Sequence, residues 1–114
     1  MGAIPCAREK VAKLFPNLAI FSVINLTFMN HDKTILVIED EVSLRNALKD
    51  KLTREEFSIL EAKNGQEGLA IALKEHPDLI LLDIIMPVMD GMTMLKKLRE
   101  DEWGKRVPVI ILTN

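Results

Sequence analysis

The stretch "LILLDIIMPVMDG", residues 79–91, decides the fold of this chain. It opens with four large apolar residues, as in a strand of a parallel sheet that helices cover on both faces. The apolar run ends at Asp83, and a loop containing Pro87 and Gly91 follows. A buried strand holds its last residue at a fixed place on the edge of the sheet. We therefore expect the Asp83 carboxylate to have a chemical role.

Strand and helix patterns alternate along residues 33–114. Apolar or alternating runs typical of strands occur at 34–38, 57–62, 79–83 and 107–112, and amphipathic patterns typical of helices occur at 42–52, 65–76 and 92–100. Alternation with short links predicts an α/β fold, a doubly wound parallel sheet with right-handed crossovers. The strand lengths and burial patterns favour the flavodoxin-like strand order 2-1-3-4, counted from the first of these strands.

Size and composition indicate one ordinary globular domain. The chain has 114 residues, of which 48% are hydrophobic and 28% are charged. Its formal net charge of −2 gives no electrostatic footprint for nucleic acid or for an anionic membrane. The single cysteine, Cys6, excludes an internal disulfide and a multi-cysteine metal site. We expect a cytoplasmic domain that contacts neither nucleic acid nor membrane.

Residues 1–32 are expected to be an N-terminal extension of uncertain structure. Residues 18–29 are mostly apolar and follow several basic residues, as in a signal peptide. Polar residues interrupt this run, no small-residue cleavage site follows it, and it is too short to span a bilayer. Met29 resembles a natural start, so we interpret residues 1–28 as an upstream segment. A β-prone segment that packs on the main domain is the alternative.

Carboxylates follow two of the expected strands. Glu39, Asp40 and Glu41 come after the first strand, Asp83 ends the third, and Thr113 follows the fourth. Parallel strands bring their carboxyl ends to one edge, where α/β sheets form their sites. Crowded carboxylates repel one another unless a cation joins them, and oxygen ligands without His or Cys favour Mg²⁺. An aspartate at such a site can also act as a nucleophile and form an aspartyl phosphate.

Helix capping is the alternative explanation for these acids. Asp40 or Ser43 would cap the first predicted helix, and Asp90 would cap the last. Asp83 has no helix immediately after it, so capping does not explain this residue. The cluster as a whole therefore favours a functional site over a set of caps.

Three motifs resemble the receiver domain of bacterial two-component response regulators. They are "ILVIEDE" at 35–41, "LLDIIMPVMDG" at 81–91 and "VPVIILT" at 107–113. The resemblance covers residues 33–114, and its most specific part is Asp-x-x-Met-Pro-x-Met-Asp-Gly after a buried strand. It implies a phosphorelay module, not itself an enzyme, that takes a phosphoryl group from a sensor histidine kinase or a phosphotransfer protein.

The resemblance also implies a role for each residue of the site. Asp83 matches the phosphoacceptor and a metal ligand, Asp40 matches the direct Mg²⁺ ligand, and Glu39 matches an acid that reaches the metal through water. The backbone carbonyl of Ile85 matches the third protein ligand. Thr113 matches the hydroxyl that moves toward the phosphoryl group and reports phosphorylation.

Two residues are expected to position the loop after Asp83. Pro87 fixes the backbone there, and Gly91 lets it turn into the next helix, although Gly91 also fits a simple turn glycine. A haloacid-dehalogenase-like phosphatase would need a second acid where this chain has Ile85, and a nucleotide-binding module would need a glycine-rich turn after the first strand. The alternative we keep is a degenerate or incomplete receiver that acts only as a protein-interaction module.

The chain departs from the family at its C-terminal side. The family's fold has a fifth strand with flanking helices, and a lysine at the end of that strand pairs with the phosphoryl group. Residues 33–114 lack these parts, so we interpret them as an incomplete receiver domain from a longer reading frame. Without a neighbour, the strand at 107–112 is expected to be an exposed apolar edge. Residues 18–28 are a weak candidate to cover it.

Overall fold

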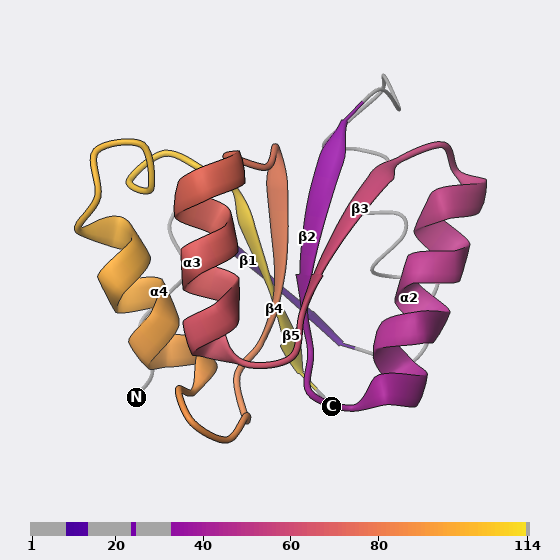
Figure 1. The fold of residues 1–114 in the computed structure, drawn as a ribbon, viewed down its shortest axis with the longest axis horizontal. Helices are drawn as coiled ribbons and strands as arrows, with labels where there is room; N and C mark the ends of the chain where they lie inside the picture. Colours follow the sequence, from indigo (N-terminus) through magenta and orange to yellow (C-terminus); the bar gives the residue numbers. More distant parts are fainter. Residues whose placement is uncertain (1–8, 14–23, 25–32, 114) are drawn as a thin grey trace.

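The computed structural model describes residues 9–13, 24 and 33–113. Within them, one parallel sheet carries helices on both faces (Figure 1). Its strands are β1 (Glu9–Lys13), β2 (Thr34–Ile38), β3 (Ser58–Ala62), β4 (Leu79–Asp83) and β5 (Val109–Thr113). The helices are α2 (Val42–Arg54), α3 (Gly65–Glu75) and α4 (Gly91–Arg99). Apart from β1, each element lies within about two residues of its predicted bounds.

The predicted strand order is confirmed. The sheet runs β1-β5-β4-β2-β3, so the four strands expected from residue 33 onward lie in the order 2-1-3-4. All their pairings are parallel. The change of direction falls between β2 and β4, which is the switch point where sheets of this kind form their sites.

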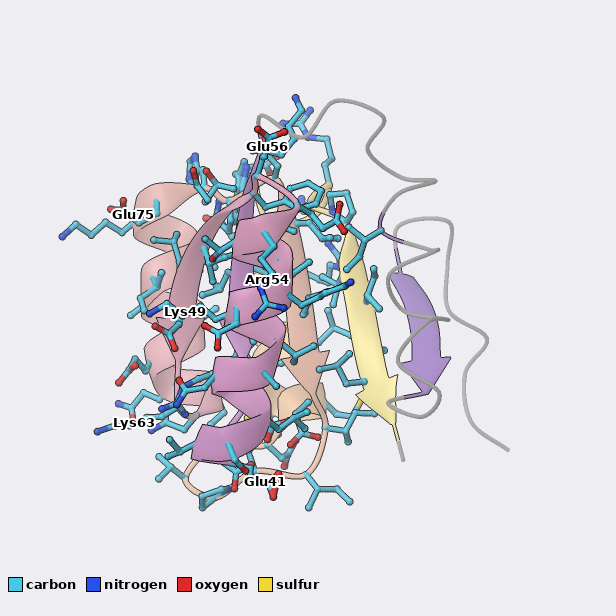
Figure 2. All side chains as sticks on the ribbon, turned by 90° about the vertical axis from the view of Figure 1, so that its right-hand side faces the viewer. Glu41, Lys49, Arg54, Glu56, Lys63 and Glu75 are labelled. Atoms are coloured by element: carbon cyan, nitrogen blue, oxygen red, sulfur yellow. The ribbon has the colours of Figure 1, made fainter. Side chains whose placement is uncertain are left out.

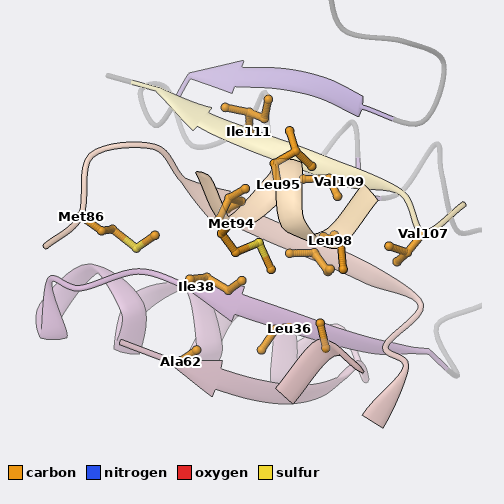
Figure 3. Close-up of a cluster of buried hydrophobic side chains, with 13 residues drawn as sticks. Leu36, Ile38, Ala62, Met86, Met94, Leu95, Leu98, Val107, Val109 and Ile111 are labelled. Carbon is orange, nitrogen blue, oxygen red and sulfur yellow. The ribbon is translucent and has the colours of Figure 1, made fainter. Parts of the chain in front are cut away.

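Alternate residues of the central strands enter two separate cores. Ile35 and Val37 of β2 pack on the face that α2 covers, together with Leu48 and Leu52 of that helix. The neighbouring positions of the same strand face α3 and α4 on the other side, where Leu98 is completely buried (Figure 3). Because helices cover both faces of the sheet, every residue of β2 after Thr34 is apolar, as its continuous apolar run predicted. Each such side chain contributes roughly 1.5–3 kcal/mol through burial.

Strand β1 was not predicted. It lies parallel to β5, with Glu9 paired to Val109 and Lys13 paired to Thr113 (Figure 2). The predicted exposed edge at the last strand is therefore wrong, because β5 has β4 on one side and β1 on the other. The sequence "EKVAK" has no continuous apolar run, and its backbone pairing is what makes it a strand.

The covering strand also comes from a different segment than the weak candidate at 18–28. Of that candidate, the structure describes only Ile24, which is buried in the core on the α2 face. Part of the predicted extension thus contributes to the sheet, and the domain boundary at residue 33 stays a prediction. In the parts of the chain described here, no helix is long and apolar enough to cross a membrane.

Candidate functional site

Three acids come together at the carboxyl edge of the sheet. Ile38 of β2 pairs in register with Leu82 of β4, so the next residues along these two neighbouring strands are Glu39 and Asp83. Together with Asp40, they place one carboxylate oxygen each within 4.8 Å of one another. The structure thus brings together the three carboxylates that the sequence placed at one edge.

Glu39 is the charged residue that the fold buries most deeply among those it describes. Its side chain is only 2% exposed, and its Oε2 accepts a hydrogen bond of 3.0 Å from the Glu41 N–H. Burial raises the pKa of Glu39 to about 8, and the nearby Asp83 charge adds to this effect. The Glu39 carboxyl therefore keeps its proton near neutral pH when no cation is present.

Burial also raises the pKa of Asp83, which is half-buried at the end of β4. The Ile85 N–H opposes this shift by donating to Asp83 Oδ1 at 3.3 Å. The interaction between the two neighbouring carboxyl groups lowers the pKa of Asp83 but raises that of Glu39. Within this pair, the interaction with Glu39 therefore opposes the effect of burial on Asp83, whereas at Glu39 it adds to the effect of burial.

The nearest described guanidinium does not neutralise this cluster. Arg45 Nη1 donates to the backbone oxygen of Glu39 at 2.8 Å, and Arg45 Nε pairs with Glu61 at 3.5 Å. Among the side chains that the structure describes, no ion pair reaches Asp40 or Asp83. An all-oxygen cluster with excess negative charge has the donor set that Mg²⁺ prefers.

The loop after Asp83 is closed by a close approach of two backbones. The Gly91 N–H donates to the Ile84 oxygen at 2.8 Å. A Cβ at Gly91 would lie closer to the Asp83 carbonyl oxygen than van der Waals contact allows. Gly91 does not have positive φ, so the position requires glycine for space and not for an unusual turn. This favours the predicted loop-positioning role over that of a simple turn glycine.

Capping explains one of the acids and not the others. Asp90 is the N-cap of α4, and its Oδ1 accepts from the Thr93 N–H at 2.8 Å. The N-cap of α2 is Glu41, without a side-chain cap hydrogen bond. The alternative in which Asp40 or Ser43 caps that helix is therefore wrong, and the Asp40 carboxylate lies in the acidic cluster instead.

The remaining predicted residues lie at the same edge. Thr113 ends β5, one residue after Leu112, which pairs in register with Asp83. Ile85 is 85% exposed on the loop, so its backbone lies beside solvent next to the acids. Sequence reasoning missed Lys13, which the register of β1 brings opposite Thr113. Only knowledge of the β1–β5 pairing identifies it, because nothing in its local sequence marks it.

Comparison with known proteins defines the class. Residues 35–114 match the family described as the response regulator receiver domain. The chain belongs to this family, as the motifs predicted. It is 46% identical over 79 residues to the transcriptional regulatory protein SrrA of Staphylococcus aureus, covering 69% of this chain and 32% of that protein. Over 84 residues it is 40% identical to the probable transcriptional regulator ycf27 of Porphyra purpurea, covering 74% of this chain and 33% of that one.

Solved structures agree with the fold. The N-terminal domain of a response regulator receiver protein from Methanoculleus marisnigri superposes with a TM-score of 0.69 at 34% identity, covering 71% of this chain and 66% of that one. The receiver domain of a sensor histidine kinase from Pseudomonas aeruginosa gives 0.70 at 29% identity, covering 72% and 67%. That structure has a magnesium ion coordinated in its active site cleft. The present chain spans about a third of the length of the curated relatives named above.

Proposed function

We propose that this receiver domain accepts a phosphoryl group on Asp83 in a Mg²⁺-dependent reaction. The donor is a phosphohistidine on a sensor histidine kinase or a phosphotransfer protein, in the cytoplasm. One observation carries the proposal: Asp83 ends a buried strand inside a cluster of three carboxylates that no described cation neutralises. Such a cluster is costly to the fold, which makes a purely structural role a poor explanation for it.

Asp40, Asp83 and the backbone carbonyl of Ile85 are the proposed metal ligands, with Glu39 acting through water. When bound, Mg²⁺ offsets the negative charge of the phosphoryl group and of the carboxylates around it. The oxygen donors and their spacing within 4.8 Å fit this ion. The rigid β2 and β4 strands hold two of the acids before any ligand arrives, so little reorganisation is needed.

The chain's own chemistry in this reaction is a nucleophilic attack. An Asp83 carboxylate oxygen forms a bond to phosphorus while the bond from phosphorus to the histidine nitrogen breaks, and the imidazole leaves with that electron pair. The nucleophile must be ionised, and the interaction with Glu39 favours the ionised form because it lowers the pKa of Asp83. The Ile85 N–H at 3.3 Å restrains the orientation of the Asp83 carboxylate.

The pairing of β1 with β5 gives further support to the proposal. The family resemblance implies a lysine at the end of a strand next to the one that bears the hydroxyl, and here Lys13 is the residue in register with Thr113. We expect Lys13→Gln to slow phosphorylation, because a positive charge at this position offsets charge on the transferring group. Lys10→Gln is the matched control, since Lys10 pairs with Ile110 farther from the edge.

The test is direct labelling of the chain by acetyl phosphate in the presence of Mg²⁺. We expect one phosphoryl group per chain, located on Asp83 by mass spectrometry after borohydride reduction. The label should be lost in hydroxylamine, because an acyl phosphate is a mixed anhydride that nucleophiles attack. Stable labelling on a serine or threonine would contradict the proposal. A complete lack of labelling, with the fold and metal binding retained, would favour a degenerate receiver that acts only as an interaction module.

A further inference from the structure

The loop that follows Asp83 is attached to a second helix. The first residue of α3 is Gly65, and its N–H donates to the carbonyl oxygen of Met89 at 3.1 Å. The first N–H groups of a helix have no partner inside the helix. At α3, the loop between β4 and α4 supplies such a partner. A backbone N–H of the helix and a backbone carbonyl of the loop therefore form a hydrogen bond with each other.

The start of α3 is itself fixed in place. The Asn64 side chain accepts from the Glu67 N–H at 2.8 Å, and Glu67 Oε1 accepts from the Lys63 N–H at 3.3 Å. This arrangement resembles a capping box, except that Glu67 accepts from the residue before the N-cap. These contacts hold the first turn of α3, which carries the Gly65 N–H.

Gly65 allows a contact that no other residue would allow. It is buried, and a Cβ there would lie closer to the Met89 carbonyl oxygen than atoms can approach. The same Cβ would lie 3.1 Å from both the Met89 carbonyl carbon and its Cγ. Backbone atoms cannot rotate away as a side-chain end does, so any substitution at Gly65 must displace the loop.

The loop is strained where this contact holds it. Val88 has a φ of 69°, a left-handed value that β-branched residues rarely adopt. The turn is closed by the Met89 N–H, which donates to the Pro87 oxygen at 2.8 Å. Val88 is 78% exposed, so burial of its side chain does not hold it there. Neighbouring backbone contacts have to maintain such strain, and the Gly65–Met89 hydrogen bond is one of them.

We propose that Gly65 is a positioning residue for the metal site: by holding Met89, it sets the path of residues 84–90 and so the placement of Asp83 and Ile85. This inference rests on the proposed function, because it assumes that these residues bind the metal. It concerns a residue outside the acidic cluster, on a helix that contributes no ligand.

The chain offers a matched control on the same helix. Gly68 is also buried in α3, and the three atoms nearest to a Cβ there would all belong to the Ile38 side chain, the nearest at 2.5 Å. Gly68→Ala and Gly65→Ala therefore add the same methyl group to the same helix. Only the methyl group of Gly65→Ala presses on the loop backbone.

The experiment measures Mn²⁺ affinity of the full 114-residue chain by water proton relaxation, with circular dichroism to confirm folding. We expect Gly65→Ala to weaken Mn²⁺ binding about tenfold, as loss of a supporting contact does at metal sites, and Gly68→Ala to leave it unchanged. The double variant Gly65→Ala with Val88→Gly should recover part of the affinity, because glycine lets the loop take a new path. Unchanged affinity in Gly65→Ala, or an equal loss in Gly68→Ala, would overturn the inference.

Nuclear magnetic resonance separates this inference from the proposed function. If the natural chain binds no Mn²⁺, the proposed metal site is wrong, and the amide resonances of Asp83 and Ile85 then decide about Gly65. They must shift in Gly65→Ala and not in Gly68→Ala, and the opposite result rejects the positioning role. If Gly65→Ala does not fold, the test is instead the rate of hydrogen exchange at the Gly65 N–H of the natural chain. That exchange must slow on Mn²⁺ or Mg²⁺ binding, and an unchanged rate rejects the inference.

Discussion

Asp83 and Asp90 stand at the two ends of one loop and have opposite surroundings. Asp90 is exposed, accepts a hydrogen bond from the Thr93 N–H at 2.8 Å, and has its pKa lowered by that bond. Asp83 is half-buried beside two other acids, and burial raises its pKa. A helix N-terminus presents unpaired N–H groups to a carboxylate, whereas neighbouring strand ends gather carboxylates against each other. The same side chain therefore stabilises the fold at one end of the loop and destabilises it at the other.

This difference is the one expected between an acid with a structural role and an acid with a reactive one. The N–H groups at the start of α4 satisfy Asp90, so it has no need of a further partner. Asp83 receives a long hydrogen bond from the Ile85 N–H and lies against Glu39, so a bound cation would improve its surroundings. Substitution of Asp83, of the acids that surround it, or of Asp90 tests this difference.

Replacement of each of the two aspartates by asparagine should give the largest difference between the two ends of the loop. We expect Asp83→Asn to abolish labelling by acetyl phosphate, because an amide keeps the shape but has neither the charge nor the nucleophilic oxygen. Asp90→Asn should retain labelling, since asparagine is also a good N-cap. Quantitative mass spectrometry of both variants checks this. Undiminished labelling of Asp83→Asn would show that the acceptor is a different residue.

Removal of the Asp40 carboxylate should abolish metal binding. In the natural chain, we expect Mg²⁺ to bind with a dissociation constant in the millimolar range, about −4 kcal/mol, because few protein ligands hold an ion that retains several waters. Asp40→Ala removes a proposed direct ligand. Asp50→Ala is the control, since Asp50 is exposed on α2 outside the cluster. A calorimetric titration that is the same for Asp40→Ala and the natural chain would exclude Asp40 as a ligand.

The metal-free chain should lose stability as the pH rises. The pKa of Glu39 is about 8 in the folded chain, compared with 4.5 for an unperturbed glutamate. Between these values the folded state keeps a proton that the unfolded state has released, so the stabilisation is complete below pH 4.5 and is lost as the pH approaches 8. Urea unfolding at several pH values, with a metal chelator present, measures this slope.

Glu39→Gln should flatten that pH dependence, because glutamine does not titrate and still accepts the Glu41 N–H. Glu75→Gln, which removes an exposed carboxylate on α3, should leave it unchanged. If Glu39→Gln retains the full slope, another group is responsible for it.

Loss of the Asp90 cap should have the smallest effect. Asp90→Ala removes the hydrogen bond to the Thr93 N–H and should lower the free energy of unfolding by about 1 kcal/mol. Mg²⁺ affinity should stay within error of the natural chain, because Asp90 is not in the acidic cluster. A loss of Mg²⁺ binding in Asp90→Ala would mean that the two ends of the loop are coupled more tightly than the comparison assumes.

Local patterns were sufficient to predict most of the fold. Continuous apolar runs such as residues 79–83 predicted buried strands, and the acids after them predicted a site at the carboxyl edge. The strands and the clustering of the acids were predicted correctly, because burial and side-chain period are properties of a few adjacent residues. The same local reasoning could not choose between a cap and a cluster for Asp40, because that depends on where the helix begins and on what lies across the sheet.

The sequence by itself determined the family, the strand order of residues 33–114 and the identity of the three clustered acids. Tertiary structure decided the contacts between residues far apart in the chain. The pairing of β1 with β5 joins residues 9–13 to residues 109–113, and the Gly65 hydrogen bond joins α3 to the loop at Met89. Backbone groups make these contacts, and every residue except proline carries the same N–H and C=O. No pattern of side chains therefore marks them before the chain has folded.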